Sequence, residues 1–263
     1  MPLDYSQTGE PYIPLPNPHD NIILTPPRTI PNPNGTDPAE PTTIPEADLD
    51  AITTHLNDPS IYLCLEATPV PYKRDYAISF TRTIATEAAR ILQAAQTEQW
   101  VEGCPFHDIR ILPEHGEDCR IQRAEKIGDI TFSRKAFYEI PPDTPERAAA
   151  EKENEARKAG DEEIKWTMGY WLAPAYHGKG IMAAALSTLI REWVVPRMNA
   201  KMIIGSAFAE NRASLQVMRK CGFTEDEKVI EKGSRELNAA RGGGRKDIVI
   251  VTWRRKDENT KTD

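Results

Sequence analysis

A glycine-rich turn from His177 to Met182 has the residue types of a phosphate-binding corner. Gly178 and Gly180 carry no Cβ, so neighbouring backbone N–H groups can point together at one anion. The chain before the turn is predicted to be a strand that ends at Pro174, and the chain after it an amphipathic helix. Because the first turn of a helix adds unpaired N–H groups and a positive dipole end, the sequence predicts a site for a ligand that carries a diphosphate.

Two other nucleotide-binding patterns fit this turn less well. Gly178, Gly180 and Ala183 satisfy G-x-G-x-x-A, but the dinucleotide fold also requires an acidic residue about 20 residues later. Residues 197–209, where that acid would stand, contain neither Asp nor Glu. The frame G-x-x-x-x-G-K-[ST] of a nucleoside-triphosphate loop is absent as well. We therefore expect a different diphosphate-bearing cofactor, and a turn that only begins a helix stays open as the structural alternative.

A second strand and helix follow the first pair. Lys201–Phe208 is predicted as a short strand, and the segment from Asn211 to Gly222 as a helix. Asn is a favourable N-cap and Gly a favourable left-handed stop, so both ends of this helix are marked in the sequence.

Three stretches of the chain resemble the GNAT superfamily of acyl-CoA N-acyltransferases, and within it the RimJ/RimL-like branch. They are G-Y-W-L-x-P with the glycine turn at 169–182, N-x-x-S-x-x-V-M-x-K-x-G-F at 211–223, and I-I-L-T-P-P-R at 22–28 leading to N-D-P at 57–59. The resemblance covers most of residues 20–256 and implies an α/β (α+β) fold with a largely antiparallel, splayed central sheet flanked by helices. This family usually has Arg or Gln, and Gly or Ala, where this chain has His177 and Met182.

The resemblance also implies acetyl-CoA as co-substrate. The strand Trp166–Leu172 is expected to end in a bulge that splays it from the next strand and exposes backbone groups to the pantetheine arm. The diphosphate is expected on residues 177–182. The predicted cofactor-binding residues are Tyr170, Trp171, Leu172, His177, Gly178, Lys179, Gly180, Ile181, Met182, Asn211 and Ser214.

Acyl transfer from a thioester to an amine needs a neutral amine, a polarised carbonyl and a proton for the departing sulfur. A backbone N–H near Trp171 or Leu172 is predicted to donate to the thioester oxygen. Many relatives have a Tyr where this chain has Met218, which cannot donate a proton. Ser214, one turn earlier, is the predicted catalytic acid, and completion of the helix cap is its structural alternative.

Glu210 is the predicted general base, because it stands at the end of the second strand beside Asn211. Its alternative role is electrostatic support of the helix N-terminus. Asp129 and Glu66 are further candidates that would reach the acceptor through water.

Four cysteines without a C-x-x-C pair indicate a reducing compartment. Cys104, His107, His115 and Cys119 form C-x2-H-x7-H-x3-C, which has the ligand types of a zinc site. The family that the chain resembles needs no metal, so we predict none. The other two cysteines, Cys64 and Cys221, are predicted to be small core residues.

The formal charge of −7 argues against general nucleic-acid binding. A locally basic region near the C-terminus is predicted to be a solvated loop that leads into the last strand; its residues are Lys232, Arg235, Arg241, Arg245 and Lys246. No apolar run approaches the roughly 18 residues of a membrane span, and no secretion signal is visible. We expect a cytoplasmic location, with the nucleus open, and no membrane partner.

The sequence predicts one acyltransferase domain at 21–256, after an extended N-terminal segment at 1–20 and before a polar tail at 257–263. A charged helical insertion is predicted at 141–163. The other predicted elements are strands at 21–25, 108–112, 126–133 and 247–254, and helices at 46–56 and 74–99.

The predicted function is transfer of an acyl group, expected to be acetyl, from acyl-CoA to a primary amine by direct attack. The acceptor would be a protein N-terminus or a small amine, and the protein a monomer or homodimer. The alternative is a non-catalytic acyl-CoA-binding sensor or interaction protein. A nicotinamide-dependent dehydrogenase is a third hypothesis, which cofactor binding would distinguish.

Overall fold

A computed structural model describes residues 4–31, 41–66, 68–114, 120–134, 137, 140–141, 143–225, 234–237 and 239–256. Within these residues the main sheet has ten strands. Nine follow one another across the sheet: β1 (Asp4–Tyr5), β2 (Pro11–Pro14), β3 (Ile22–Thr25), β6 (Asp108–Ile111), β7 (Glu125–Ser133), β8 (Lys165–Leu172), β9 (Met202–Phe208), β12 (Gly244–Arg254) and β10 (Thr224–Glu225). The tenth, β11 (Ser234–Leu237), pairs with the first residues of β12, and β4 (Ile30–Pro31) pairs with β5 (Pro41–Thr43) in a separate ribbon.

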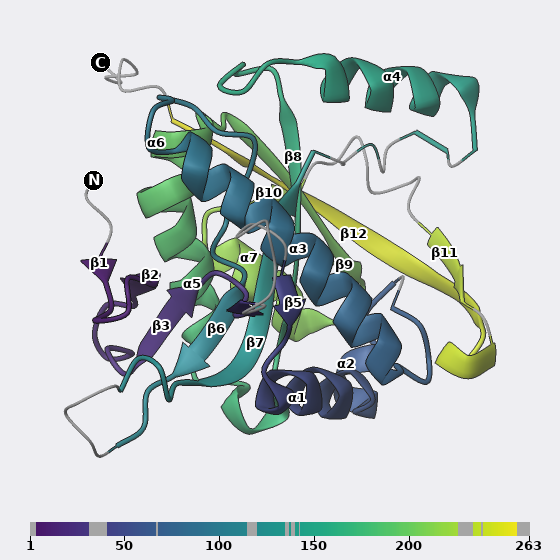
Figure 1. The fold of residues 1–263 in the computed structure, drawn as a ribbon. Coiled ribbons are helices and arrows are strands. Elements are labelled where there is room, and N and C mark those ends of the chain that lie inside the picture. The colour runs from purple at the N-terminus through teal and green to yellow at the C-terminus, as the bar shows by residue number, and fades with distance from the viewer. Residues whose placement is uncertain are drawn as a thin grey trace.

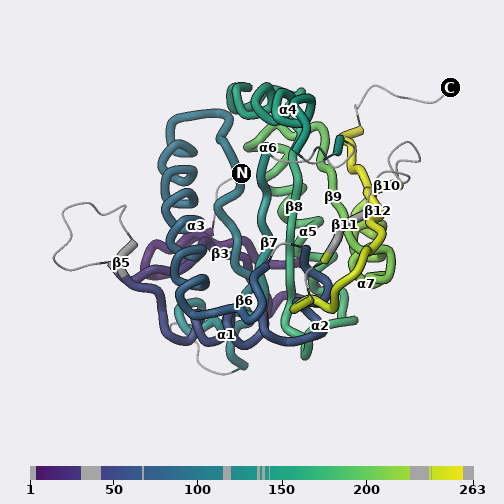
Figure 2. Tube along the Cα trace, turned by 90° about the vertical axis from the view of Figure 1, so that its right-hand side faces the viewer, coloured from purple at the N-terminus to yellow at the C-terminus, as the bar shows by residue number. Residues whose placement is uncertain are grey.

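Helices cover both faces of the sheet (Figure 1). They are α1 (Glu46–Leu56), α2 (Pro59–Tyr62), α3 (Arg74–Ala94), α4 (Pro145–Ala156), α5 (Ile181–Leu189), α6 (Val195–Met198) and α7 (Arg212–Lys220), with a π-helical turn at Ile190–Val194 between α5 and α6. Figure 2 shows α3 on one side of the strands and α5 and α7 on the other. None of the helices in the described part of the chain is both long and apolar enough to cross a bilayer.

The predicted fold class is confirmed, because the sheet is mixed and largely antiparallel. Its parallel pair is β8 and β9, which are paired from Lys165↔Met202 to Thr167↔Ile204 and then diverge. Each strand keeps its outer neighbour past that point, β8 with β7 as far as Leu172 and β9 with β12 as far as Phe208. The predicted splay is therefore present. Over the described residues of β7 and β8 no register shift accompanies it, so the predicted bulge is wrong.

The N-terminal segment contains more regular structure than its prolines indicate. β2 pairs with β3, and Ile13 and Leu15 are almost completely buried. Pro11 and Pro14 are tolerated because they are the first and last residues of β2, where a missing N–H donor costs the ladder little. The apolar residues Ile13 and Leu15 are two positions apart, which is the spacing of one face of a strand. The high proline content of the segment favoured irregular chain instead.

The predicted helix at 46–56 matches α1, whereas α3 ends at Ala94, five residues before its predicted end. Arg197 of α6 donates hydrogen bonds of 2.8 Å to the carbonyls of Ala95 and Glu98. Those carbonyls are thus satisfied by a distant residue, which a local sequence pattern cannot reveal.

The charged insertion contains α4, which lies beyond one end of the sheet (Figure 1). It is joined to the sheet by Asn154, whose side chain is buried and exchanges hydrogen bonds of 2.9 Å with the backbone of Lys165 and donates another to Arg134. The start of β8 is therefore fixed by this insertion.

We expect Gly128→Ala to destabilise the fold by about 1–3 kcal/mol, because the new Cβ would lie 2.7 Å from the backbone oxygen of Trp171 and force β7 from β8. Gly169→Ala is the matched control, since its Cβ would meet Thr131 Oγ1 at an ordinary 3.6 Å. Urea unfolding of both variants measures the difference. Equal stability of the two variants would contradict this account of β7–β8 packing.

Candidate functional site

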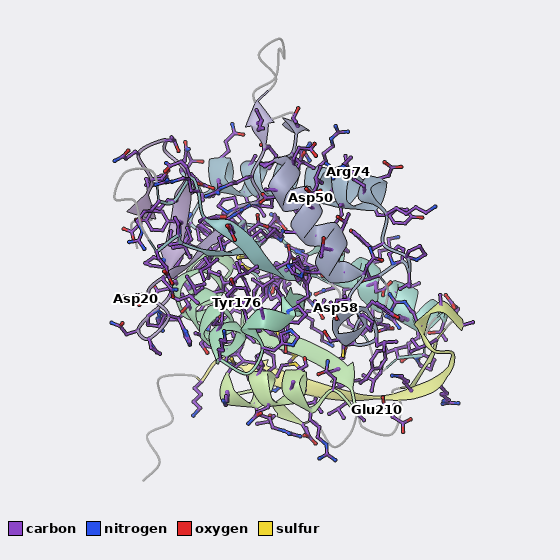
Figure 3. The ribbon with its side chains drawn as sticks, turned by 90° about the horizontal axis from the view of Figure 1, so that it is seen from below. Asp20, Asp50, Asp58, Arg74, Tyr176 and Glu210 are labelled. Carbon is purple, nitrogen blue, oxygen red and sulfur yellow. The ribbon has the colours of Figure 1, made fainter. Side chains whose placement is uncertain are left out.

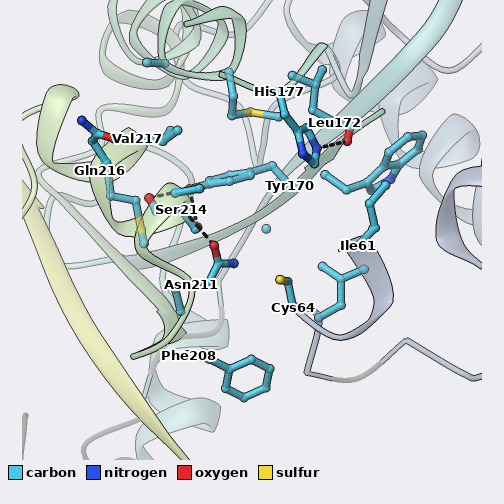
Figure 4. A pocket seen from close by; sticks show the side chains of 18 of the residues that line it. Ile61, Cys64, Tyr170, Leu172, His177, Phe208, Asn211, Ser214, Gln216 and Val217 are labelled. Carbon is cyan, nitrogen blue, oxygen red and sulfur yellow. Dashed lines mark hydrogen bonds between the residues drawn. The ribbon is translucent and has the colours of Figure 1, made fainter. Parts of the chain in front are cut away.

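The divergence of β8 and β9 opens a cavity of about 510 Å³. One wall is formed by the start of α5 and by α7, and the opposite wall by α2 and the residues that follow it (Figure 4). All eleven predicted cofactor-binding residues except Lys179 line this cavity. The sequence motifs thus meet at one place, although the role of each residue stays a prediction.

The glycine turn has the backbone that the sequence predicts. Gly178 and Gly180 have φ angles of +73° and +82°, in the left-handed region that glycine adopts without strain. A Cβ on Gly178 would meet nothing within 4 Å, so the turn presents open space. The N–H of Ala184 donates to Gly180 O, and the three amides before it have no acceptor within the helix. This corner can therefore hold an anion.

The two non-glycine side chains of the turn take different directions. His177 Nε2 lies 2.6 Å from Leu172 O and donates to it, which ties the turn to the end of β8. Lys179 is exposed, with its Nζ 5.4 Å from the centre of the Tyr176 ring. In a view from below, Tyr176 and Asp58 lie on the same face of the molecule (Figure 3). The lowered pKa of Asp58 comes mainly from hydrogen bonds donated by Ser60, with smaller contributions from His55 and His177.

At the N-terminus of α7 the hydroxyl of Ser214 meets the phenol of Tyr170 from β8. Asn211 Oδ1 accepts the N–H of Ser214 at 3.1 Å, which confirms the predicted N-cap. The Ser214 hydroxyl takes no part in this cap and lies 2.7 Å from Tyr170 Oη (Figure 4). Burial raises the pKa of Tyr170 to about 12, so its phenol stays protonated at neutral pH. Met218 is buried beside Gly205, at the point where β8 and β9 part.

The end of β8 offers backbone donors to the cavity. Ala173 N–H donates to Ile127 O of β7, and successive N–H groups of an extended chain point to opposite edges. The N–H of Trp171 therefore faces β7, whereas that of Leu172 faces the cavity. The ring of Trp171 packs against His55 of α1, with ring centres 5.7 Å apart.

Glu210 lies away from the cavity lining, at the margin of the molecule (Figure 3). Its side chain is 75% exposed and pairs with Lys246 at 3.0 Å. Glu66 does line the cavity. The assignment of a general base therefore stays a prediction.

Cys64 of the opposite wall and Arg241, which contacts the wall residue Leu65, differ from their predicted environments. Cys64 is exposed and lines the cavity, so its prediction as a core residue is wrong. Arg241, predicted in a solvated loop, is 4% exposed and donates to the carbonyl of Leu65. Its contact partner lies 176 residues earlier, beyond the range of a local pattern. Lys232 of the same basic region lies outside the described residues.

A buried charge network, which sequence analysis missed, lies on the α1 side of the site. Its members are Asp48, Asp108, Arg110, Lys126 and Asp129. Burial opposes ionisation of Asp108, but the charges of Lys126 and Arg110 outweigh it and lower its pKa. Burial raises the pKa of Asp129 to about 6. Charged residues at alternate positions of β6 were the available signal.

Of the four residues with zinc-ligand types, Cys104 and His107 are buried. Burial raises the pKa of Cys104 to about 12 and lowers that of His107 to about 4. His115 and Cys119 lie outside the described residues. Within the described ranges, no group of three or more His, Cys, Asp or Glu residues is placed to hold a metal ion.

Comparison with known proteins links these features to one family. The family model described as acetyltransferase (GNAT) domain matches residues 42–224. No curated protein is significantly similar to the chain in sequence.

Solved structures with a similar fold include the ribosomal-protein-S5-alanine acetyltransferase from Vibrio fischeri, at 14% identity, 90% coverage of this chain, 94% of the other and a TM-score of 0.47. The ribosomal L7/L12 alpha-N-protein acetyltransferase RimL has 15% identity, coverages of 96% and 99%, and a TM-score of 0.49. A GNAT-family acetyltransferase from Bacillus anthracis has 13% identity, coverages of 92% and 98%, and a TM-score of 0.47.

We expect the effect of Asp129→Asn on the free energy of unfolding to depend on pH. The difference between variant and parent should be about 1–3 kcal/mol more favourable to the variant at pH 7 than at pH 4. The folded pKa of Asp129, about 6, exceeds the ordinary value of about 3.9. Between these pH values the folded protein binds more protons than the unfolded chain, so this carboxyl lowers stability as the pH rises.

Urea unfolding at the two pH values measures this difference, and Asp50→Asn, at a largely exposed aspartate of α1, is the control. An Asp129→Asn effect that does not change with pH would contradict the raised pKa.

Proposed function

Because this chain belongs to the family of GNAT acetyltransferase domains, we propose that it is an acyl-CoA-dependent N-acyltransferase that transfers acetyl from acetyl-CoA to a primary amine by direct attack. The observation that carries the proposal is the joining of the glycine corner to the cavity between β8 and β9. An anion site at one end of a narrow, partly apolar slot suits a long thioester with a diphosphate.

The residues present fit coenzyme A. The amides from Gly178 to Ala183 would hold the diphosphate, because the glycine corner leaves open space there. The unpaired edge of β8 would hydrogen-bond the amides of the pantetheine arm, as a further strand would. Bound acetyl-CoA would supply the thioester carbonyl.

The N–H of Leu172 is the proposed donor to the thioester oxygen, since it faces the cavity while that of Trp171 faces β7. A donor aimed at an oxygen that gains charge contributes about 3 kcal/mol to barrier lowering. Ser214 is the proposed acid for the sulfur. Glu210 is proposed as the general base, and Glu66, which lines the cavity and would act through water, is its competitor.

The far end of the cavity supports a proposal for the acceptor. Apolar residues of that end include Ile61, Leu65, Phe208 and Ile248. Burial in such surroundings lowers the pKa of an ammonium group and favours the neutral amine that attacks. An α-amine, with an ordinary pKa near 8, reaches that state more easily than a lysine, near 10.4. We therefore propose an α-amine on an apolar residue as the acceptor, in keeping with the resemblance to the RimJ/RimL-like branch.

Gly178→Ala should weaken coenzyme A binding about tenfold, because a Cβ would stand in the proposed diphosphate position. Gly9→Ala is the matched control, with a similar φ of +81° and open space around the new Cβ, but outside the cavity. Titration calorimetry measures both affinities. Equal affinities in the two variants would place the diphosphate elsewhere, and no binding by the parent protein would end the proposal.

Release of free thiol from acetyl-CoA should depend on an added amine, and peptides that begin with an apolar residue should react at least about tenfold faster than N-blocked lysine peptides. A panel of peptides and small amines measures these rates. Faster reaction of lysine peptides would reject the α-amine assignment. Tight coenzyme A binding without thiol release for any acceptor would instead favour a non-catalytic sensor.

A further inference from the structure

Tyr170 and Ser214 join the two sides of the opened sheet. Tyr170 projects from β8 past the point where β9 diverges, and Ser214 stands in the first turn of α7. Their hydroxyl oxygens are 2.7 Å apart, and both residues line the cavity. The contact is a direct polar link across the slot, in the region where the thioester would lie.

The chemistry of the pair favours the Tyr170 hydroxyl as the donor. Tyr170 Oη has two acceptors on the same residue, Ser214 Oγ at 2.7 Å and Ser214 O at 3.1 Å. A phenol is a more acidic donor than an alcohol, and the shorter of the two contacts is the one to Oγ. Asn211 Oδ1 accepts the Ser214 N–H, so the helix is capped without the serine hydroxyl. Its own proton is then left to point into the cavity.

We infer that Tyr170 is a positioning residue: it donates to Ser214 Oγ and so directs the Ser214 proton at the sulfur of the acyl donor. This role rests on the proposed function, because it concerns the same cavity. It adds a second hydroxyl group to the proposed site, because the phenol of Tyr170 donates to Ser214 Oγ and polarises the Ser214 O–H bond.

The chemistry balances without an outside reagent. The amine nitrogen forms a bond to the carbonyl carbon, the carbon–sulfur bond breaks, and its electron pair leaves with sulfur. Ser214 donates a hydrogen bond to sulfur as this charge develops, and Tyr170 donates to Ser214. The nitrogen loses one proton as it becomes an amide, and the sulfur gains one proton as it becomes a thiol, so the protons balance.

Burial of the phenol indicates that the pair donates hydrogen bonds and does not ionise. The pKa of Tyr170 is raised to about 12, chiefly by burial, whereas that of a thiol is about 8.5. Full transfer of the tyrosine proton to a thiolate would thus be unfavourable. A charged sulfur is instead stabilised in place, and the lasting proton comes from the nitrogen, which becomes cationic and acidic once the neutral amine has bonded to the carbonyl carbon.

The test measures the thiol pKa of bound coenzyme A, from the ultraviolet absorbance of the thiolate as the pH is raised. In the parent protein this pKa should lie below the free value of about 8.5. Tyr170→Phe and Ser214→Ala should each raise it by about one unit, and Ser214→Thr, which keeps a hydroxyl, should restore most of the shift. Tyr76→Phe and Ser79→Ala, on the exposed side of α3, are the matched controls.

A kinetic cycle with the same variants supplies a second readout. Each single change should lower kcat about three- to tenfold with little change in KM for acetyl-CoA, and the double variant should be no worse than Ser214→Ala. Additive losses would show two independent roles and overturn the positioning role. An unchanged bound-thiol pKa in Tyr170→Phe, with coenzyme A still bound, would overturn this inference alone. Absence of coenzyme A binding in the parent protein would overturn the proposed function as well.

Discussion

The parallel pair β8–β9 is the constraint on which the site depends. Its ladder ends at Thr167↔Ile204, yet each strand stays bonded to its outer neighbour for several more residues. The sheet therefore parts between β8 and β9 while each half keeps its own hydrogen-bonded ladder. Unpaired backbone groups normally cost free energy when they are buried, so an opened seam persists only where water or a ligand can satisfy them. Met168 and Met218, packed around Gly205, fill the space at the start of the opening.

Topology explains why two helix N-termini meet at this seam. In a parallel pair both strands end at the same edge, and the helix that follows each begins there. α5 follows β8 through the glycine turn, and α7 follows β9 through the Asn211 cap. Both positive dipole ends thus lie beside one cavity. A negatively charged ligand would be attracted there by the backbone alone.

Those parts of the site that depend on local backbone chemistry could be predicted from the sequence. The glycines with positive φ, the Asn211 cap and the boundaries of α1 were readable because each is determined within a few residues. The contact between Tyr170 and Ser214 was not, since it spans 44 residues and depends on where the strand parts. The burial of Arg241 and the early end of α3 have the same origin, in partners far along the chain.

The buried charges of β6 and β7 have a consequence for how this fold can diverge among related sequences. Arg110 contacts Asp48 and Asp108, and Lys126 contacts Asp108 and Asp129, so the loss of Arg110 or Lys126 leaves the carboxylate of Asp48 or Asp129 buried without its cationic partner. Apolar replacement of the whole set avoids that penalty. Substitutions at these five positions should therefore be inherited together, as a covarying group, and the order in which they arise should be restricted.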